Sequence, residues 1–415
     1  MMPFSVPRGR FKDRRLEKLN CGRLHTACRS ARLHMEPLED RRVLALVTWD
    51  GGGTSTDWNE AANWTNNVLP GAADDVVIDV AASPTITFSS GSASIKSLQS
   101  TEVISLSGGT LSIAEASQID NALNLSGGTL AGTGNLTVSG TLNWTSGTMS
   151  GSGTTIVGAG GTLNISSGNT HTLSRILQND GTAHWTGGAL QMISGTFNNN
   201  GSFTANSNST LQSYGSGGAN AFNNAGTFTK LGTGTTYFTF SSTGVPFNNT
   251  GSVDVQQGTL ELDAGGLNSG AFNVPLGATL YFGNGYTHQA GSTLNNAGTT
   301  TLSSGTHSYS GTLTNTGTFN IDSSATANML AAQSLSGTVN LAGILGGTQN
   351  ATVSGTLNWT SGTMSGSGTT IVGAGGTLNI SSGNTHTLSR ILQNDGTAHW
   401  TGGALQMISG TFNNN

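Results

Sequence analysis

Two carboxylates two positions apart, Glu261 and Asp263, are the first residues in this sequence whose types and spacing could do chemistry. Cleavage of a glycosidic bond uses two carboxyl groups that face one cleft. On a β-strand, residues i and i+2 share a face, so this pair points to one side while Leu260 and Leu262 point to the other. We expect the leucines in the core and the acids on a solvated outer face. Because nothing else converges on the pair, we predict that the protein is not an enzyme.

Histidines could bind a metal ion or act as general bases, and six of the eight lie after residue 81. None of these has a second histidine or a cysteine at the spacing of a zinc site. The Gly-Gly-x-Gly-x-Asp repeats that bind calcium, and glycine loops that end in Lys-Ser or Lys-Thr, are also missing. We therefore expect no metal and no cofactor. The six histidines are His171, His184, His288, His307, His386 and His399.

Two His-Trp pairs, His184-Trp185 and His399-Trp400, offer an aromatic ring beside a polar one. In the first pair, Ala183 and Trp185 fall on one face of a strand and His184 on the other. If Ala183 packs inside, Trp185 belongs to the core and His184 is exposed. The alternative is that both pairs contact a glycan, with the tryptophan stacked on a sugar ring. The four residues remain candidates for glycan contact.

The composition indicates a folded body with a very bland surface. Only 8% of the 415 residues are charged, against about 25% in ordinary globular proteins. Eleven of the 15 Lys and Arg lie in residues 1–42 beside five acids, which leaves a net charge of +6 there and −11 in the remainder. The chain after residue 42 has too few Lys and Arg residues to form a basic surface that binds nucleic acid. Both cysteines, Cys21 and Cys28, are in the basic segment, so no disulfide framework is expected beyond it.

The end of the basic segment carries a short motif. The apolar run of residues 43–47 is short for a secretion signal, and nothing approaches the roughly 20 residues of a membrane span. The alternative is a disordered basic tail without a signal. Residues 38–44, Leu-Glu-Asp-Arg-Arg-Val-Leu, resemble the LEPR-XLL-type leader of large exported bacterial proteins, with Asp40 in place of the usual proline. The resemblance implies that residues 1–46 are an export leader and that the protein is extracellular or at the cell surface. The matching residues are Leu38, Glu39, Arg41 and Leu44.

Residues 47–80 combine three of the seven tryptophans, Trp49, Trp58 and Trp64, with an alternating apolar run at 76–80. Alternation predicts a first strand. A solenoid needs a cover over its first coil, because an open end exposes apolar core and unpaired strand edges. We expect a tryptophan-rich cap, with a sugar-stacking platform as the alternative.

From residue 81 onward, one phrase recurs: apolar, x, Asn, x, Gly, then Thr or Ser. Its glycines are on average about 23 residues apart, a spacing typical of solenoids. Between them, apolar residues alternate with polar ones and no 3.6-residue period is sustained, which indicates short strands. We predict an all-β fold, a parallel β-helix with about three strands per coil and roughly 15 coils over residues 81–415. Asn and Gly are expected at corners, in left-handed or tight conformations. The glycines are Gly181, Gly201, Gly226, Gly251, Gly270, Gly298 and Gly317.

The repeat body also contains a long exact duplication. Residues 137–200 recur letter for letter at 352–415, 215 positions further on, which indicates duplication of a multi-coil block, and the chain is compatible with a piece of a longer array. Within the first copy we expect Leu142, Trp144 and Ile156 to point inward.

The phrases GTLN and NNxGTF resemble repeats of secreted bacterial β-helix proteins of the filamentous-haemagglutinin and autotransporter-passenger kind. That resemblance implies an adhesin-like structural stalk that contacts surface glycans or other cell-surface polymers, or that self-associates along the rod. The alternative is a β-helix that binds or degrades carbohydrate.

Overall fold

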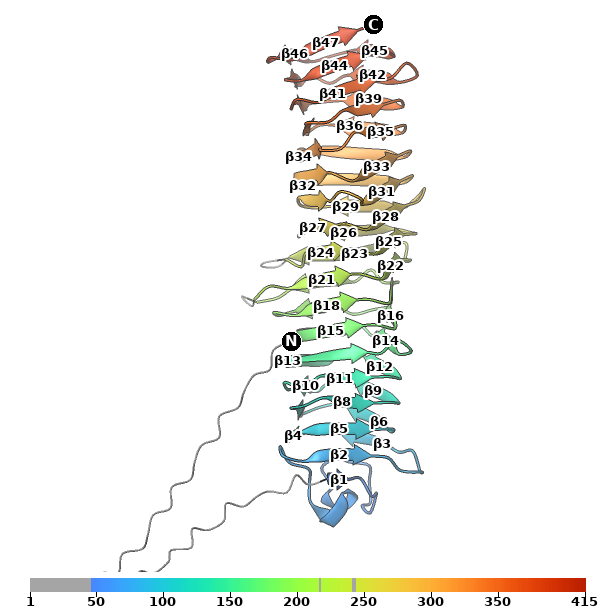
Figure 1. Cartoon of the computed structure of the whole chain (residues 1–415), viewed down its shortest axis with the longest axis vertical. Coiled ribbons are helices and arrows are strands. Elements are labelled where there is room, and N and C mark those ends of the chain that lie inside the picture. The colour runs from blue at the N-terminus through green and yellow to red at the C-terminus, as the bar shows by residue number, and fades with distance from the viewer. Residues whose placement is uncertain (1–45, 216–217, 241–243) are drawn as a thin grey trace, which may run out of the picture. The chain divides into compact units, whose positions relative to one another are not determined.

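The computed structural model describes residues 46–215, 218–240 and 244–415. The expected export motif, with Leu38, Glu39, Arg41 and Leu44, lies outside the described residues and remains a prediction. From Leu46 onward the chain is a parallel β-solenoid, as the sequence predicts (Figure 1). The described helices are two 3-10 turns, η1 (Ala61–Asn63) and η2 (Thr65–Asn67). Neither is long or apolar enough to cross a membrane.

The strands follow one another in sets of three, and each set is one coil with three faces. Every pairing between coils is parallel. Face 1 is a ladder of 17 described strands, one from each coil: β3 (Thr85–Phe88), β6 (Val103–Leu106), β9 (Ala122–Leu125), β12 (Thr141–Trp144), β14 (Thr162–Ile165), β16 (Thr182–Trp185), β19 (Ser202–Ala205), β22 (Thr227–Lys230), β25 (Ser252–Val255), β28 (Ala271–Val274), β31 (Thr293–Asn296), β33 (Thr312–Asn315), β35 (Gln333–Leu335), β38 (Ala351–Val353), β41 (Thr369–Val372), β44 (Ile391–Asn394) and β47 (Thr411–Asn414).

Face 2 follows face 1 in each coil. Four of its strands are long and continue around the corner, so their second halves belong to face 3. Its strands are β4 (Ser92–Ile95), β7 (Thr110–Ile113), β10 (Thr129–Ala131), the first halves of β13 (Gly147–Val157) and β15 (His171–Asn179), β17 (Leu190–Met192), β20 (Thr210–Ser213), β23 (Thr235–Phe240), β26 (Thr259–Leu262), β29 (Thr279–Phe282), the first halves of β32 (Thr299–Tyr309) and β34 (Thr318–Met329), β36 (Thr338–Leu341), β39 (Thr356–Trp359), β42 (Thr377–Ile380) and β45 (Thr397–Trp400).

Face 3 closes each coil, and it begins two steps earlier than the other faces, because β1 and β2 precede the first strand of face 1. It consists of β1 (Leu46–Thr48), β2 (Asp75–Ile78), β5 (Ser97–Ser100), β8 (Ser117–Ile119), β11 (Leu136–Val138), the second halves of β13 and β15, β18 (Thr196–Asn199), β21 (Ala221–Asn224), β24 (Phe247–Asn249), β27 (Gly266–Asn268), β30 (Tyr286–His288), the second halves of β32 and β34, β37 (Ile344–Gly347), β40 (Gly362–Met364), β43 (Thr385–Leu388) and β46 (Ala404–Met407).

Coil length varies along the stack. Paired positions on face 1 run from Thr85 to Thr411 in 16 steps, an average of about 20 residues per coil, at the lower end of the range for solenoid repeats. The step from Thr85 to Val103 is one of the shortest, and the step from Ser202 to Thr227 is one of the longest. The sequence estimate is higher because the Asn-x-Gly phrases sample the longest coils and change from one corner of the coil to another after Gly270. At about 4.8 Å per step, the ladder is roughly 77 Å long.

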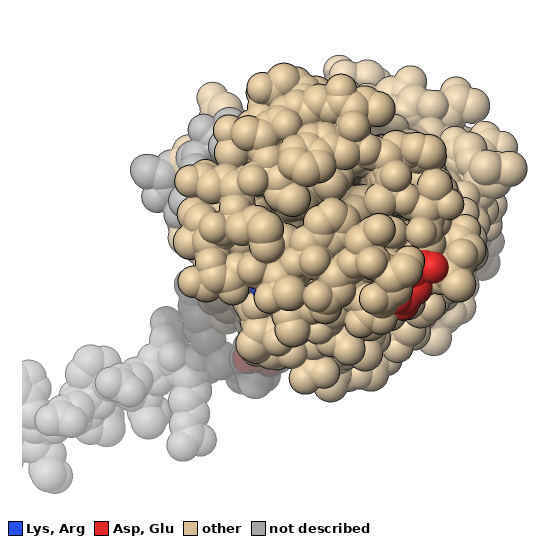
Figure 2. Space-filling view, turned by 90° about the horizontal axis from the view of Figure 1, so that it is seen from above, with Lys and Arg blue, Asp and Glu red and all other residues tan. Residues whose placement is uncertain are grey.

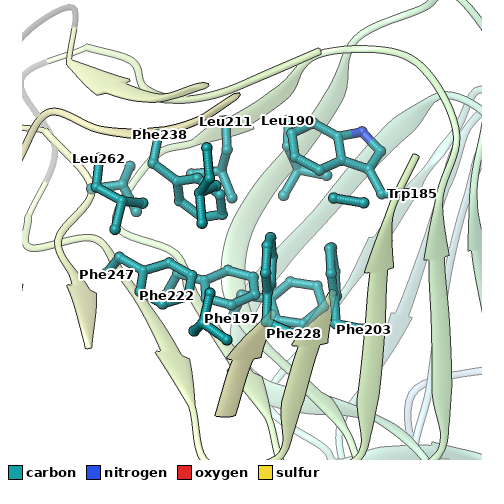
Figure 3. Close-up of a cluster of buried hydrophobic side chains, with 14 of the residues drawn as sticks. Trp185, Leu190, Phe197, Phe203, Leu211, Phe222, Phe228, Phe238, Phe247 and Leu262 are labelled. Carbon is teal, nitrogen blue, oxygen red and sulfur yellow. The ribbon is translucent and has the colours of Figure 1, made fainter. Parts of the chain in front are cut away.

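The interior is a column of apolar side chains that stack on their counterparts in the next coil. Between residues 185 and 262 it is rich in phenylalanines, which pack among leucines and Trp185 (Figure 3). Phe203 and Phe228 stack with ring centroids 5.2 Å apart, and Phe222 and Phe247 do the same at 5.2 Å, while rings on different faces meet edge to face. Offset stacking and edge-to-face packing both add to the area that these rings bury.

A second column inside the coil is made of asparagines at the corner between faces 3 and 1. Each Nδ2 except the last donates to Oδ1 of the asparagine one coil further on, at 2.7 to 2.9 Å, and to a backbone carbonyl of that coil. From Asn199 to Asn249 the amides therefore satisfy one another where water is excluded, which buried polar groups require, whereas Oδ1 of Asn179 at the start of the column has no partner within the described residues. The column consists of Asn179, Asn199, Asn224, Asn249 and Asn268.

The glycines of the repeated phrase play a different part from the one the sequence suggests. Neither they nor the column asparagines have positive φ, so of the two expected alternatives the left-handed conformation is wrong at these corners. A Cβ on Gly226 would lie 1.9 Å from the carbonyl oxygen of Gly201, and one on Gly251 would lie 2.0 Å from that of Gly226. Glycine is required at these corners because the backbones of successive coils approach too closely for any side chain.

The N-terminal end is closed by the predicted cap. Trp49 contacts Trp64, Trp64 contacts Trp58, and Trp58 contacts Phe88 of the first face-1 strand, all edge to face at 4.8 to 6.0 Å. All three indoles are buried, so the cap interpretation holds rather than the sugar-stacking one. Glu60 accepts hydrogen bonds from the backbone and hydroxyls of residues 54 and 55, which lower the pKa of its carboxyl to about 2.

The duplicated block occupies different faces in its two copies. The segment Thr-Leu-Asn-Trp is β12 on face 1 in the first copy and β39 on face 2 in the second. Likewise, the copies of Thr-Phe-Asn-Asn are β18 on face 3 and β47 on face 1. The offset between the copies therefore corresponds to ten coils and one further strand, and identical sequences point in directions one face apart.

Within the first copy, two of the three expected inward residues are confirmed. Leu142 and Trp144 are fully buried, but Ile156 lies on the outer surface while Thr155 and Val157 point inward. Pairing with β11 explains the difference, since Thr155 and Val157 stack on two buried apolar residues of the previous coil. The identity of one side chain is overruled by the register of the whole strand.

Candidate functional site

The two His-Trp pairs are placed differently by the structure. Trp185 is completely buried and donates from Nε1 to the carbonyl oxygen of Gly188 at 3.0 Å, so its ring is part of the core. His184 is exposed on the outer side of face 1. In the second copy His399 points outward from face 2, and Trp400 is 57% exposed, because no described coil stacks on it.

The carboxylates Glu261 and Asp263 point outward, as the sequence predicts. Leu260 and Leu262 on either side of Glu261 are buried. Burial first, and then the negative charge and hydrogen bond of Asp263, raise the pKa of the Glu261 carboxyl to about 7. The side chain of Asp263 lies over Gly283 of the next coil, where a Cβ would be 2.1 Å from Asp263 Oδ1.

Two tyrosines that the sequence analysis did not single out flank Glu261 on face 2. The register pairs Tyr237 of β23 with Glu261, and Glu261 with Tyr281 of β29, so the three side chains form one outward column on successive coils. Tyr237 is 36% exposed and Tyr281 is half-buried. Only the register reveals the column, because a full coil of sequence separates each residue from the next.

The same column continues as an amide ladder toward the C-terminal end. Tyr281 is paired with Thr301, and each asparagine that follows donates from Nδ2 to a side-chain oxygen of the preceding coil, at 2.8 to 3.0 Å. Face 2 therefore presents one continuous polar track along the rod. Its members after Tyr281 are Thr301, Asn320, Asn340, Asn358, Asn379 and His399.

A groove of about 330 Å³ lies beside the corner between faces 1 and 2, from the coil of β25 to that of β33. Asp254, Asn273 and Asn295 line it from successive coils, and Asn273 donates to Asp254 at 2.6 Å. Pro275 forms part of its wall, and the neighbouring Leu276 is 88% exposed. The groove and the Tyr237–Tyr281 column lie on adjoining faces, joined by the loop of residues 275–278.

The cations of the body serve the fold rather than a surface. Arg175 is buried, donates to the carbonyl oxygens of Gly153 and Gly134 at 2.9 and 3.0 Å, and so ties two earlier coils together. Arg390 does the same in the second copy, and burial lowers the pKa of both guanidinium groups to about 10. The surface seen in Figure 2 is almost without charge.

The described residues contain no group of three or more His, Cys, Asp and Glu side chains that could hold a metal ion. No family model, curated protein or solved structure matches the chain.

Proposed function

We propose that this protein is an extracellular or cell-surface stalk with a structural and adhesive role and without catalytic activity. The observation that supports this most is the uninterrupted stack of 17 described coils, closed at the N-terminal end by its own cap. Such a solenoid is stabilised by contacts between neighbouring coils, so its length can grow without a larger core. Rigid length is what a protein needs to hold a surface away from an envelope.

The outer surface supports the same proposal. Thr, Ser and Asn side chains stack on one another in columns, and their amides are paired along the rod, as in Asn124, Asn143 and Asn164 on face 1. Weak polar contacts repeated along a rod give avidity when several engage together. The LEPR-XLL-like leader adds the expectation of export, and lateral association of rods is part of the proposal.

The test is to locate the protein in cells that produce it and to measure its shape. Surface proteolysis and antibody labelling of intact cells should detect the solenoid outside, and small-angle scattering of the purified chain should give a rod about 80 Å long. Deletion of residues 38–44 should abolish export and leave the rod intact. Retention of the full chain in the cytoplasm, or a compact particle in solution, would refute the stalk.

The alternative, a β-helix that binds or degrades carbohydrate, is favoured in its binding form by one observation. Aromatic rings and carboxyl groups come together on the outside of face 2, at Tyr237, Glu261 and Tyr281. A reducing-sugar release assay on polysaccharides tests the degrading form, with turnover lost in Glu261→Gln as its signature.

A further inference from the structure

The outer surface of the rod changes character over the coils of β23, β26 and β29. Toward the C-terminal end, the polar track of face 2 consists of Thr301, four asparagines and His399, and the asparagine amides are hydrogen-bonded to the preceding coil. Here the track presents two phenol rings and a carboxyl group instead, and neither phenol hydroxyl is hydrogen-bonded within the described part of the chain. Asp263 adds a second carboxyl group on the same face.

The spacing of this group follows from the solenoid. Paired residues of neighbouring coils are about 4.8 Å apart, so Tyr237 and Tyr281 stand roughly 10 Å apart with Glu261 between them. The side chains project from strands that are paired on both sides, so little backbone freedom is lost when a ligand binds. The backbone behind them is hydrogen-bonded on both sides, which leaves no strand edge for a peptide to extend as an added β-strand.

The charge of the group selects the class of ligand. Glu261 and Asp263 repel nucleic acids and acidic polymers, and the neighbouring coils carry no exposed cation within the described residues to offset them. Carboxyl, amide and hydroxyl groups donate and accept hydrogen bonds in the way that a polyol requires. The two phenol rings add apolar surface with a polar tip. Uncharged sugars combine both features, with hydroxyl rims around apolar ring faces.

We propose that Tyr237, Glu261 and Tyr281, with Asp263 beside them, form a binding site for a neutral glycan that runs along face 2. The sugar rings lie on the two tyrosines, and their hydroxyl groups bind the carboxyl pair. The site assigns the adhesive part of the proposed stalk to particular residues, and in that sense it rests on the proposed function.

The protonation of Glu261 fits this use. Its pKa is raised to about 7 by burial and by Asp263, so near neutral pH the Glu261 carboxyl is protonated in about half of the molecules. The pair can then donate one hydrogen bond to a sugar hydroxyl and accept others.

The experiment measures binding of the full chain to soluble neutral polysaccharides: dextran, a mixed-linkage β-glucan and a galactomannan. Affinity electrophoresis and calorimetry give the dissociation constants. Tyr281→Ala and Glu261→Ala should each weaken binding about tenfold or more, while Tyr281→Phe keeps the ring and most of the affinity. The matched control is Asn358→Ala, which changes the same column of face 2 four coils further on. Circular dichroism and thermal melting of every variant verify the fold, since all four substitutions are on the outside.

Three outcomes would overturn the site: no retention by any of the three polysaccharides, equal losses in Tyr281→Ala and Asn358→Ala, or salt-sensitive binding of a lysine-rich peptide in place of glycan. None of these would affect the scattering and localisation results that test the stalk. Conversely, a cytoplasmic protein that still binds dextran through Tyr281 would refute the stalk and leave the site standing.

Discussion

Replacement of Asn224 by alanine tests whether the inner asparagine column stabilises the rod. The Asn224 amide is 1% exposed and takes part in three close hydrogen bonds: it donates to Asn249 Oδ1 at 2.8 Å and to the Ser252 carbonyl at 3.0 Å, and accepts from Asn199 Nδ2 at 2.7 Å. At about 1 kcal/mol net for each bond, the change costs roughly 3 kcal/mol. The buried Oδ1 of Asn249 also loses its donor, which adds to the cost.

The neighbouring residue supplies the control. Asn223 belongs to an outward column, where its Nδ2 donates to Asn198 at 2.9 Å and its Oδ1 accepts from Asn248 at 3.0 Å. Water can replace both bonds, so Asn223→Ala should cost less than about 1 kcal/mol. The two variants differ by one position and share the same change of side chain.

Native-state hydrogen exchange is the suitable assay, because a solenoid can open locally without unfolding as a whole. A loss of about 3 kcal/mol corresponds to roughly a 150-fold fall in protection of the amides in β21 and its two neighbours, β18 and β24. Distant coils should be unaffected. If Asn223→Ala lowers protection as much as Asn224→Ala, the inner column has no special role and the reasoning fails.

Three other predictions concern acid, corner glycines and tryptophans. Burial lowers the pKa of His288 to about 3 from an ordinary 6.5, so the unfolded chain binds a proton that the folded one does not. The contribution of neutral His288 to the free energy of unfolding is complete above pH 6.5 and falls by about 1.4 kcal/mol per pH unit toward pH 3. The free energy of unfolding of His288→Phe, measured by denaturation, should therefore depend less steeply on pH. Gly226→Ala should cost about 2 kcal/mol or more through its clash with the previous coil, whereas Gly160→Ala, with no atom within 4 Å of the new Cβ, should cost under about 0.5 kcal/mol; equal urea midpoints would contradict this. Trp185→Ala should lose about 3–5 kcal/mol and Trp400→Ala less than about 1 kcal/mol, although their sequence surroundings are identical; similar losses in calorimetry would argue against the described stacking.

The fold was open to prediction because every coil repeats the same local signals. Alternation identified the strands, the spacing of the corners identified a solenoid, and the tryptophans at 49, 58 and 64 indicated a cap. The outward position of Glu261 and the burial of Trp185 follow from alternation alone, since each depends only on its own strand.

What the sequence concealed depends on register between coils. Ile156 points outward because the preceding coil dictates which residues of β13 stack inside. The sequence suggests that glycine is needed at the corners for its backbone conformation, whereas it is needed because a carbonyl oxygen one coil away leaves no room for a Cβ. Tyr237 and Tyr281 lie in one column with Glu261, but the loops between them differ in length, so their spacing in the sequence does not reveal the column. A contact between neighbouring coils is local in space but a full coil away along the chain.

The offset between the two copies shows that the smallest unit the solenoid can gain or lose is one strand, and not one coil. Because ten coils and one strand separate the copies, the same sequence forms paired strands in two places that differ by one third of a turn. An insertion or deletion of whole strands keeps the remaining strands paired between coils, even when it does not add or remove whole coils. A third block appended with the same offset would point along the remaining face, and a fourth would return to the first. Repeated duplication with this offset would therefore place the same side chains on each of the three faces in turn along the rod.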